Sequence, residues 1–368
     1  MTPAREDDAR WMALALAEAE KAWRLSPPNP SVGAVIVRDG RVIGAGFTQQ
    51  TGGPHAEIMA LRNAFERGEP VEGATIYVTL EPCSHYGRTP PCARALIENR
   101  LGRVVAAVKD PNPAVAGRGL RMLEEAGIEV SCGVLEREAW LANAGFLTRM
   151  TTGRPWVRLK CAATLDGRTA FEDGRSQWIT GPEARRDTQY WRGRAGAVVT
   201  GIGTVKADDP QMTVRLPDQK RFPLRVVADA RMETQPDARI LAGGGTLIAA
   251  AEEHPERRAA LEAAGAEIWL IPDALRPGRV DLGKMLDRLG ERQVNDVHLE
   301  AGAVLNGAFL EADLVDEIVL YTAPCLFGSG RPIAAVAEPD SPGAARRWHV
   351  ADFRQIGSDL RMILRRKA

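Results

Sequence analysis

The chain has 368 residues, of which 45% are hydrophobic, and its acidic and basic residues are equal in number at 48 each. The length predicts two domains, and the charge balance provides no global field that would attract nucleic acid or an anionic membrane. No apolar run approaches the roughly 20 residues of a membrane span, and residues 1–8 lack the hydrophobic core of a signal peptide. An odd count of five cysteines favours a reduced, cytoplasmic protein over a disulfide scaffold.

The first part of the chain alternates between helical and strand-forming patterns. Helices are expected at 10–24, 55–67, 92–99 and 119–126, and strands at 32–37, 41–47, 75–80, 104–108 and 128–132. Asp39-Gly40 is a hairpin turn signal between the first two strands. Strands and helices that alternate at this spacing predict a layered α/β domain.

A domain boundary is expected between Trp140 and Pro155, because glycines and a proline gather there before a new strand pattern begins. We therefore expect one domain at 1–150 and a second at 151–368. The second half repeats the α/β rhythm, with strands expected at 156–162, 197–201, 224–229, 246–250, 267–271, 296–300 and 317–321, and a loop at 340–347.

One imidazole and two thiols suggest a metal site in the first half. They belong to Pro54-His55-Ala56-Glu57, Pro82-Cys83 and Pro91-Cys92. Zinc prefers nitrogen and sulfur ligands, and a catalytic site uses three protein groups and leaves a fourth position for water. We expect His55, Cys83 and Cys92 to be these groups, and Glu57 to act as the acid and base that moves protons between water and substrate.

Two other interpretations of this motif are open. His85 could be a fourth ligand of a purely structural zinc site, but Glu57 would then have no purpose. Without any metal, Cys83 and Cys92 would be small core residues, yet they lie in polar, proline-rich loops. The catalytic zinc site is favoured over both, and metal analysis of the purified protein tests it.

The second half carries polar and glycine-rich segments that suggest an anionic ligand. Lys160 lies in an apolar strand and needs an anionic partner, a ligand or water. Strands that end at Gly201 and near Gly302 open into helices whose free N–H groups could hold phosphates, and Arg192 could bind a phosphate by bidentate contacts. Each feature alone fits a structural role, such as a snorkelling lysine, whereas their order and spacing favour a functional role. Two such junctions fit a dinucleotide better than one would.

The first half resembles a known enzyme family in its motifs. His-x-Glu followed by Pro-Cys and a downstream Cys is the signature of zinc nucleobase deaminases. The eight residues that separate Cys83 from Cys92, together with Pro28-Asn29-Pro30 and the run 109–113, resemble the deaminase domain of bacterial bifunctional riboflavin biosynthesis enzymes.

This resemblance implies a cytidine-deaminase-like three-layer domain that deaminates 2,5-diamino-6-(5-phosphoribosylamino)pyrimidin-4(3H)-one. It also implies that the His-Cys-Cys set binds zinc and that the glutamate is the proton donor. The implied substrate contacts are Asn29 at the base, and His85 and Arg88 at the substrate or its phosphate.

The second half resembles the reductase domain of the same enzymes, which is similar in fold to dihydrofolate reductase. The resemblance implies that NADPH reduces the ribosyl group of 5-amino-6-(5-phosphoribosylamino)uracil to ribityl. Lys160 is the catalytic candidate, since it could polarise the group that accepts hydride, and the implied substrate contacts are Ser176, Arg192, Met212, Arg215 and Glu300. The residues implied to line the cofactor are Ala162, Trp178, Thr204, Asp208, Gly302, Ala303, Val304, Leu305, Asn306, Gly307 and Ala308.

We therefore expect a bifunctional enzyme that acts on small phosphorylated pyrimidines, forms a homo-oligomer in the cytoplasm, and binds neither nucleic acid nor membrane. One rival is a nucleic-acid or nucleoside zinc deaminase with an accessory nucleotide-binding domain, against which the balanced charge and the lack of a basic run argue. A second rival is a non-catalytic protein that retains zinc, and the intact Glu57 beside His55 counts against it.

Overall fold

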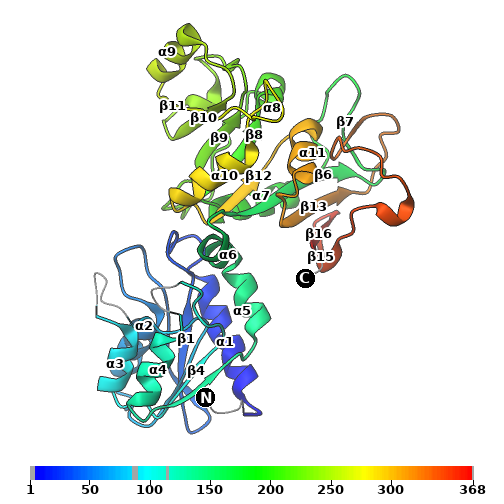
Figure 1. Ribbon diagram of the computed structural model, residues 1–368. Coiled ribbons are helices and arrows are strands. Elements are labelled where there is room, and N and C mark those ends of the chain that lie inside the picture. The colour runs from blue at the N-terminus through cyan, green and yellow to red at the C-terminus, as the bar shows by residue number, and fades with distance from the viewer. Residues whose placement is uncertain (1–4, 85–89, 113–115, 367–368) are drawn as a thin grey trace. The chain divides into compact units, whose positions relative to one another are not determined.

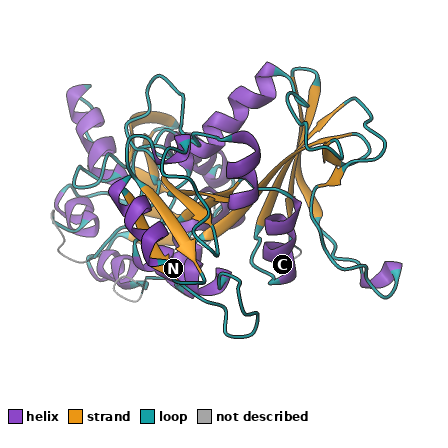
Figure 2. Cartoon of the chain, turned by 90° about the horizontal axis from the view of Figure 1, so that it is seen from above, coloured by secondary structure: helices purple, strands orange, loops and turns teal. Residues whose placement is uncertain are grey.

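The computed structural model describes residues 5–84, 90–112 and 116–366, and the chain folds into two compact units, residues 1–153 and 154–368 (Figure 1). Helices accompany the strands in both units (Figure 2). Among the described residues, no helix combines the length and the apolar character that crossing a membrane requires.

A five-stranded sheet forms the centre of the first unit, in the order β2-β1-β3-β4-β5. Its strands are β1 (Gly33–Arg38), β2 (Arg41–Phe47), β3 (Thr75–Val78), β4 (Arg103–Ala106) and β5 (Glu129–Cys132). Strand β1 pairs antiparallel with β2 and β3, whereas β3, β4 and β5 run parallel. The carboxyl ends of β3 and β4 therefore lie side by side at one edge of the sheet.

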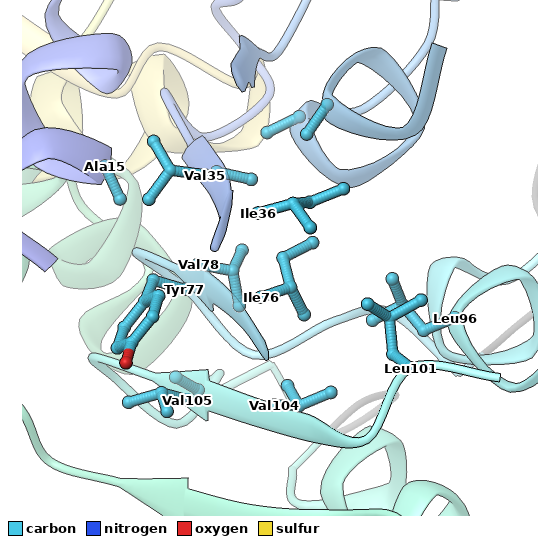
Figure 3. Packing of buried hydrophobic residues seen from close by; sticks show 14 of the residues in the cluster. Ala15, Val35, Ile36, Ile76, Tyr77, Val78, Leu96, Leu101, Val104 and Val105 are labelled. Carbon is cyan, nitrogen blue, oxygen red and sulfur yellow. The ribbon is translucent and has the colours of Figure 1, made fainter. Parts of the chain in front are cut away.

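Helices cover this sheet on both faces, as the predicted layered domain requires. They are α1 (Asp8–Glu20), α2 (Ala56–Glu66), α3 (Cys92–Glu98), α4 (Arg118–Glu125), α5 (Glu136–Ala142) and α6 (Ala144–Thr152). Helix α1 contacts β1, β3 and α5, whereas α2 contacts β1, β2 and α3. Figure 3 shows buried side chains from β1, β3 and β4, among them Ile36, Ile76 and Val104, packed between the layers.

The close approach of α2 to β2 depends on two glycines. A Cβ atom on Gly46 would lie 2.5 Å from the Ala60 backbone nitrogen, and one on Gly44 would lie 2.4 Å from the Ala60 carbonyl oxygen. Both distances are too short for a side chain. The two glycines therefore allow α2, whose first turn carries Glu57, to lie directly on the sheet.

The second unit is built on a nine-stranded sheet in the order β11-β10-β9-β8-β12-β6-β13-β16-β15. Its strands are β6 (Trp156–Thr164), β8 (Ala197–Gly201), β9 (Leu224–Ala228), β10 (Thr246–Ala250), β11 (Ala266–Leu270), β12 (Asp296–Leu299), β13 (Glu317–Ala323), β15 (His349–Ile356) and β16 (Asp359–Arg365). All pairings from β11 to β13 are parallel, and β16 and β15 continue the sheet antiparallel. A separate two-stranded ribbon joins β7 (Arg168–Ala170) and β14 (Arg331–Pro332).

Helices also pack on both faces of this larger sheet. They are α7 (Pro182–Arg194), α8 (Ile202–Asp208), α9 (Pro255–Ala263), α10 (Leu282–Glu291) and α11 (Ala303–Glu311), with short 3-10 helices at Arg239–Leu241 and Pro342–Ala344. Helices α10 and α11 bury Leu286 and Phe309 in one core with Leu159 of β6. On the opposite face, Trp191 of α7 shares a cluster with Tyr321 of β13. Strand residues of even number on β6 and β12 therefore point towards the α7 side.

The expected strands up to β13 and the expected helices of the first unit agree with the structure in type and order, and the α/β class is confirmed for both units, whereas α5, α6 and the short strand β7 were not expected. The hairpin β15–β16 was missed, because β15 is an edge strand with half of its residues exposed and charged residues within it. Gly357, with a φ of 64°, makes the turn between the two strands. It is the local signal that could have revealed the hairpin.

Candidate active sites

The first site is a cluster of His55, Cys83 and Cys92. Their ligand atoms all lie within 4.8 Å of one another, and all three side chains are buried or half-buried. The His55 Nδ1 atom lies 3.6 Å from the Cys83 Sγ atom and 3.4 Å from the Cys92 Sγ atom. The structure thus brings together the three residues that the motif spacing indicated.

Local backbone structure explains this convergence. His55 is the extended N-cap residue of α2, and Cys92 is the first residue of α3. The loop that carries Cys83 is held to the start of α3, where the Cys92 N–H donates to the Cys83 Sγ atom at 3.3 Å and the Ala93 N–H donates to the Cys83 carbonyl at 3.2 Å. Hydrogen bonds from Cys92 and His55 lower the pKa of the Cys83 thiol, which favours the thiolate that binds metals.

The donor set fits a zinc ion. One nitrogen and two sulfurs are ligands that zinc prefers, and three protein ligands leave one position of the tetrahedron for water. The fourth-ligand alternative concerns His85, which lies outside the described residues, as does Arg88.

Glu57 lies in the first turn of α2 next to the cluster and is only 3% exposed. Burial raises the pKa of its carboxyl group to about 7. A cation bound by the neighbouring ligands would favour the ionised form of this carboxyl. Glu57 therefore lies where its carboxyl group could exchange protons with a water molecule at the fourth position of the metal site.

Asn29 belongs to a short loop that precedes β1. Its N–H donates to the Ser26 carbonyl at 3.0 Å. The same loop is held by Asn143, whose side chain accepts from the Ser31 N–H at 2.7 Å and donates to the Ser31 carbonyl at 2.9 Å. The backbone that presents Asn29 is thus anchored, while its contact with a substrate stays a prediction.

The second site is centred on Glu300, directly after β12. Arg192 of α7 donates from Nε and Nη2 to the two Glu300 oxygens at 2.7 and 2.9 Å. His298, which is fully buried on β12, places its Nε2 atom 3.2 Å from the Glu300 Oε1 atom. Burial alone would raise the pKa of Glu300, but Arg192, His298 and Lys160 hold it well below its usual range.

Sequence reasoning named Glu300, Arg192 and Lys160 and missed His298. His298 lies on β12 two residues before Glu300, and this extended spacing directs both side chains to one face of the sheet. Burial lowers the pKa of its imidazole, and a neutral ring can donate one hydrogen bond to the carboxylate. The sequence did carry a signal for His298, because a histidine two residues before a carboxylate at a predicted strand end is expected to lie beside it.

The segment 212–215 lies against Arg192. The Arg192 Nη1 atom donates to the Thr213 carbonyl at 2.8 Å, and its Nη2 atom approaches the Met212 sulfur at 4.0 Å. The Arg215 N–H donates to the Gln189 side chain at 2.9 Å, while the residue itself is exposed. Arg192, Met212 and Glu300 are thus brought together, and Arg215 stays accessible to an anion.

Thr204 and the run 302–308, among the expected cofactor residues, gather where β8 and β12 end. These parallel strands are neighbours, and a Cβ atom on Gly302 would lie 3.9 Å from the Thr204 Oγ1 atom. A Cβ atom on Gly201 would likewise lie 3.3 Å from the Leu305 side chain. The starts of α8 and α11 therefore stand side by side, at the edge of a parallel sheet where dinucleotides bind in α/β folds.

Two residues of the run 302–308 also support a neighbouring segment. The Asn306 side chain donates to the Ala301 and Ile333 carbonyls at 3.2 and 2.8 Å. A Cβ atom on Gly307 would lie 1.9 Å from the Ala335 carbonyl oxygen, so no other residue fits there. Among the remaining expected positions, Val304 and Trp178 are 67% and 70% exposed, Asp208 is exposed, and Ala162, Ser176 and Ala308 are half-buried.

A zinc-type His-Cys-Cys cluster in one α/β unit and a dinucleotide-type strand edge in the other define a two-centre enzyme. Residues 5–108 match the family model of the cytidine and deoxycytidylate deaminase zinc-binding region, and residues 155–362 match the RibD C-terminal domain. The chain belongs to the RibD family of riboflavin biosynthesis proteins.

Curated and solved relatives agree along the full chain. The riboflavin biosynthesis protein RibD of Escherichia coli is 45% identical over 96% of this chain and 98% of its own. A solved RibD of Acinetobacter baumannii is 42% identical with a TM-score of 0.87, covering 99% of both chains. A solved diaminohydroxyphosphoribosylaminopyrimidine deaminase/5-amino-6-(5-phosphoribosylamino)uracil reductase of Thermotoga maritima is 34% identical with a TM-score of 0.86, covering 98% of this chain and 99% of its own.

These findings confirm the predicted family, fold and enzyme class. The chain is a bifunctional deaminase and reductase of riboflavin biosynthesis, with zinc and NADPH as its cofactors.

Proposed function

We propose that residues 1–150 carry the deaminase and residues 151–368 the reductase, which act in that order. The first removes the amino group of 2,5-diamino-6-(5-phosphoribosylamino)pyrimidin-4(3H)-one, and the second reduces the ribosyl group of the deaminated product to ribityl. The observation that supports this most directly is the cluster of His55, Cys83 and Cys92 with the buried Glu57 beside it.

In the deaminase, the three ligand side chains would hold zinc, which when bound acidifies a water molecule. Glu57 accepts one proton from the attacking water and passes it to the ring nitrogen. It then accepts the second proton from the hydroxyl group now bonded to the ring carbon and passes it to the amine, which departs as ammonia. The burial of Glu57 beside the three ligand residues supports this role, because the carboxyl group then exchanges protons only with groups bound in the site. Asn29, His85 and Arg88 are proposed to hold the pyrimidine and its phosphate.

In the reductase, NADPH when bound supplies hydride, and the starts of α8 and α11 are proposed to hold its phosphates. Arg192 keeps the Glu300 carboxylate ionised and oriented through two charge-assisted bonds. Lys160 polarises the sugar group that accepts hydride, and Arg215 binds the substrate phosphate together with Ser176 and Met212.

Measuring both activities in each of two variants tests the assignment of one reaction to each unit. Glu57→Ala should abolish ammonia release while NADPH oxidation with the deaminated substrate stays intact, and Arg215→Ala should weaken only the second reaction. Arg62→Ala, at an exposed position of α2, serves as the control that changes neither. Joint loss of both activities in either variant would contradict the assignment of one site to each unit.

We propose further that the enzyme is a cytoplasmic homo-oligomer that does not act on nucleic acid. The equal numbers of acidic and basic residues support the absence of nucleic-acid binding. Binding of single-stranded oligonucleotides at physiological salt would instead favour the rival nucleic-acid deaminase.

A further inference from the structure

Glu81 is a buried carboxylate that neither proposed reaction uses. It stands two residues before the zinc ligand Cys83 and is only 4% exposed. A carboxylate is rarely buried unless its oxygens are satisfied. Its partners therefore indicate what the residue does.

The Glu81 carboxylate accepts four backbone N–H groups. Its Oε2 atom accepts from Asp110 at 3.1 Å and from Gly117 at 2.9 Å, and its Oε1 atom accepts from Gly119 at 2.9 Å and from Leu120 at 3.4 Å. We call Glu81 with these four N–H groups the Glu81 clamp. Three of the donors are at or beside the start of α4, whose N-cap residue Gly117 offers no capping side chain of its own.

Capping of α4 alone does not account for the clamp, because Asp110 lies outside the helix. The Asp110 N–H donates to the same oxygen as the Gly117 N–H. The carboxylate thus ties the backbone that follows β4 to the first turn of α4. A helix cap needs only donors from the helix itself.

Two backbone contacts next to the clamp hold the turn that presents Cys83. The Glu81 N–H donates to the Val108 carbonyl at 2.9 Å. A Cβ atom on Gly119 would lie 1.9 Å from the Pro82 carbonyl oxygen, so α4 and the turn pack without space between them. The segment after β4 and the metal-ligand turn after β3 are therefore held together.

Both segments leave the carboxyl ends of neighbouring parallel strands, since β3 pairs with β4. Ligands of open α/β sheets bind outside this edge, and Cys83 is already there as a metal ligand. Residues 110–112 consequently stand beside the deaminase centre, where they can contact a substrate.

We propose that Glu81 is a positioning residue of the deaminase, which holds residues 110–112 in register with the Cys83 turn and so sets the shape of the substrate site. This rests on the proposed placement of the deaminase in the first unit. Glu81 touches neither metal ligand atoms nor substrate, and acts through the backbone.

Glu81→Gln tests the proposal with almost no change in shape. The amide keeps one acceptor oxygen and turns an NH₂ group towards N–H donors, so about half of the clamp is lost. Loss of a buried acceptor should raise the deaminase KM by roughly tenfold to a hundredfold. Zinc content should stay stoichiometric and the reductase rate of the same chain unchanged. Glu66→Gln, at an exposed position of α2, is the matched control.

Gly119→Ala is a second perturbation, and it removes no charge. Its added methyl group must push α4 away from the Pro82 carbonyl. The same rise in KM with zinc retained is expected. An unchanged deaminase KM in both variants, with only a lower melting temperature, would overturn the proposal and leave a structural cap. A failure of the Glu81 proposal can be distinguished from a failure of the proposed deaminase function, since in the second case the unmodified protein would release no ammonia.

Discussion

Glu300→Gln is the substitution that most directly tests the reductase centre. Glu300 receives two hydrogen bonds from Arg192, at 2.7 and 2.9 Å, and lies 3.2 Å from the His298 ring nitrogen. The amide removes the negative charge and one of the two acceptor oxygens. Arg192, whose side chain is 9% exposed, then loses its counter-charge in a buried place.

The size of the effect follows from these contacts. A hydrogen bond to a charged group contributes about 1.5–3 kcal/mol, and breaking a buried ion pair costs about 3–5 kcal/mol. Since one of the two hydrogen bonds from Arg192 can persist, we take a loss of about 3 kcal/mol in transition-state stabilisation. This loss corresponds to a fall of about a hundredfold in kcat/KM. The fall should concern the reductase alone.

The assay follows NADPH oxidation with the deaminated substrate, and ammonia release by the same preparation reports on the first unit. Glu291→Gln, at the exposed end of α10, is the matched control and should be neutral. A reductase kcat/KM equal to that of the unmodified enzyme would refute the assigned role of Glu300. Loss of ammonia release at the same time would point to general misfolding.

Two further predictions concern the first unit. Asp8 accepts hydrogen bonds from Arg103 at 2.7 and 2.8 Å and from Tyr77 at 2.8 Å. Asp8→Asn should therefore lower the melting temperature of this unit by roughly 10 °C. Breaking a buried ion pair costs about 3 kcal/mol, and the melting temperature of a unit of this size shifts by about 3 °C per kcal/mol. Burial would raise the pKa of Asp8, but Arg103, Arg5 and Tyr77 lower it, so the stabilisation is complete above the unfolded value of about 4 and is lost as pH falls through the folded one. Scanning calorimetry from neutral pH downwards should show the gap between the two proteins closing, and a constant gap would contradict this account. Zinc removal with a chelator should stop ammonia release and spare NADPH oxidation, and added zinc should restore the first activity.

Local signals explain why so much of the first site could be predicted. His55 lies at a helix N-terminus and Cys92 begins the next helix, and both positions can be inferred from proline and helix-start patterns. Glu57 follows from its distance of two residues to His55. None of these inferences requires knowledge of which strands are neighbours.

Contacts between residues far apart in the chain could not be predicted from such local signals. The Glu81 donors are 29 to 39 residues away in the chain, and Arg192 and Glu300 are separated by 108 residues. Which side chains meet over such separations depends on strand order, here β3 beside β4 and β12 beside β6. Strand order results from the packing of the whole sheet, so it cannot be inferred from a short motif.

The sequence by itself determined the ligand chemistry of the first site, because residue type and short spacing define which groups can bind zinc. The two-reaction character followed from the resemblance of both halves to a known enzyme family. Only the tertiary structure decided how these groups are held: Glu81 tying the turn before Cys83 to α4, and Glu300 oriented between Arg192 and His298. The physical reason is that buried charges must find their partners in space, and the fold alone determines which partners are within reach.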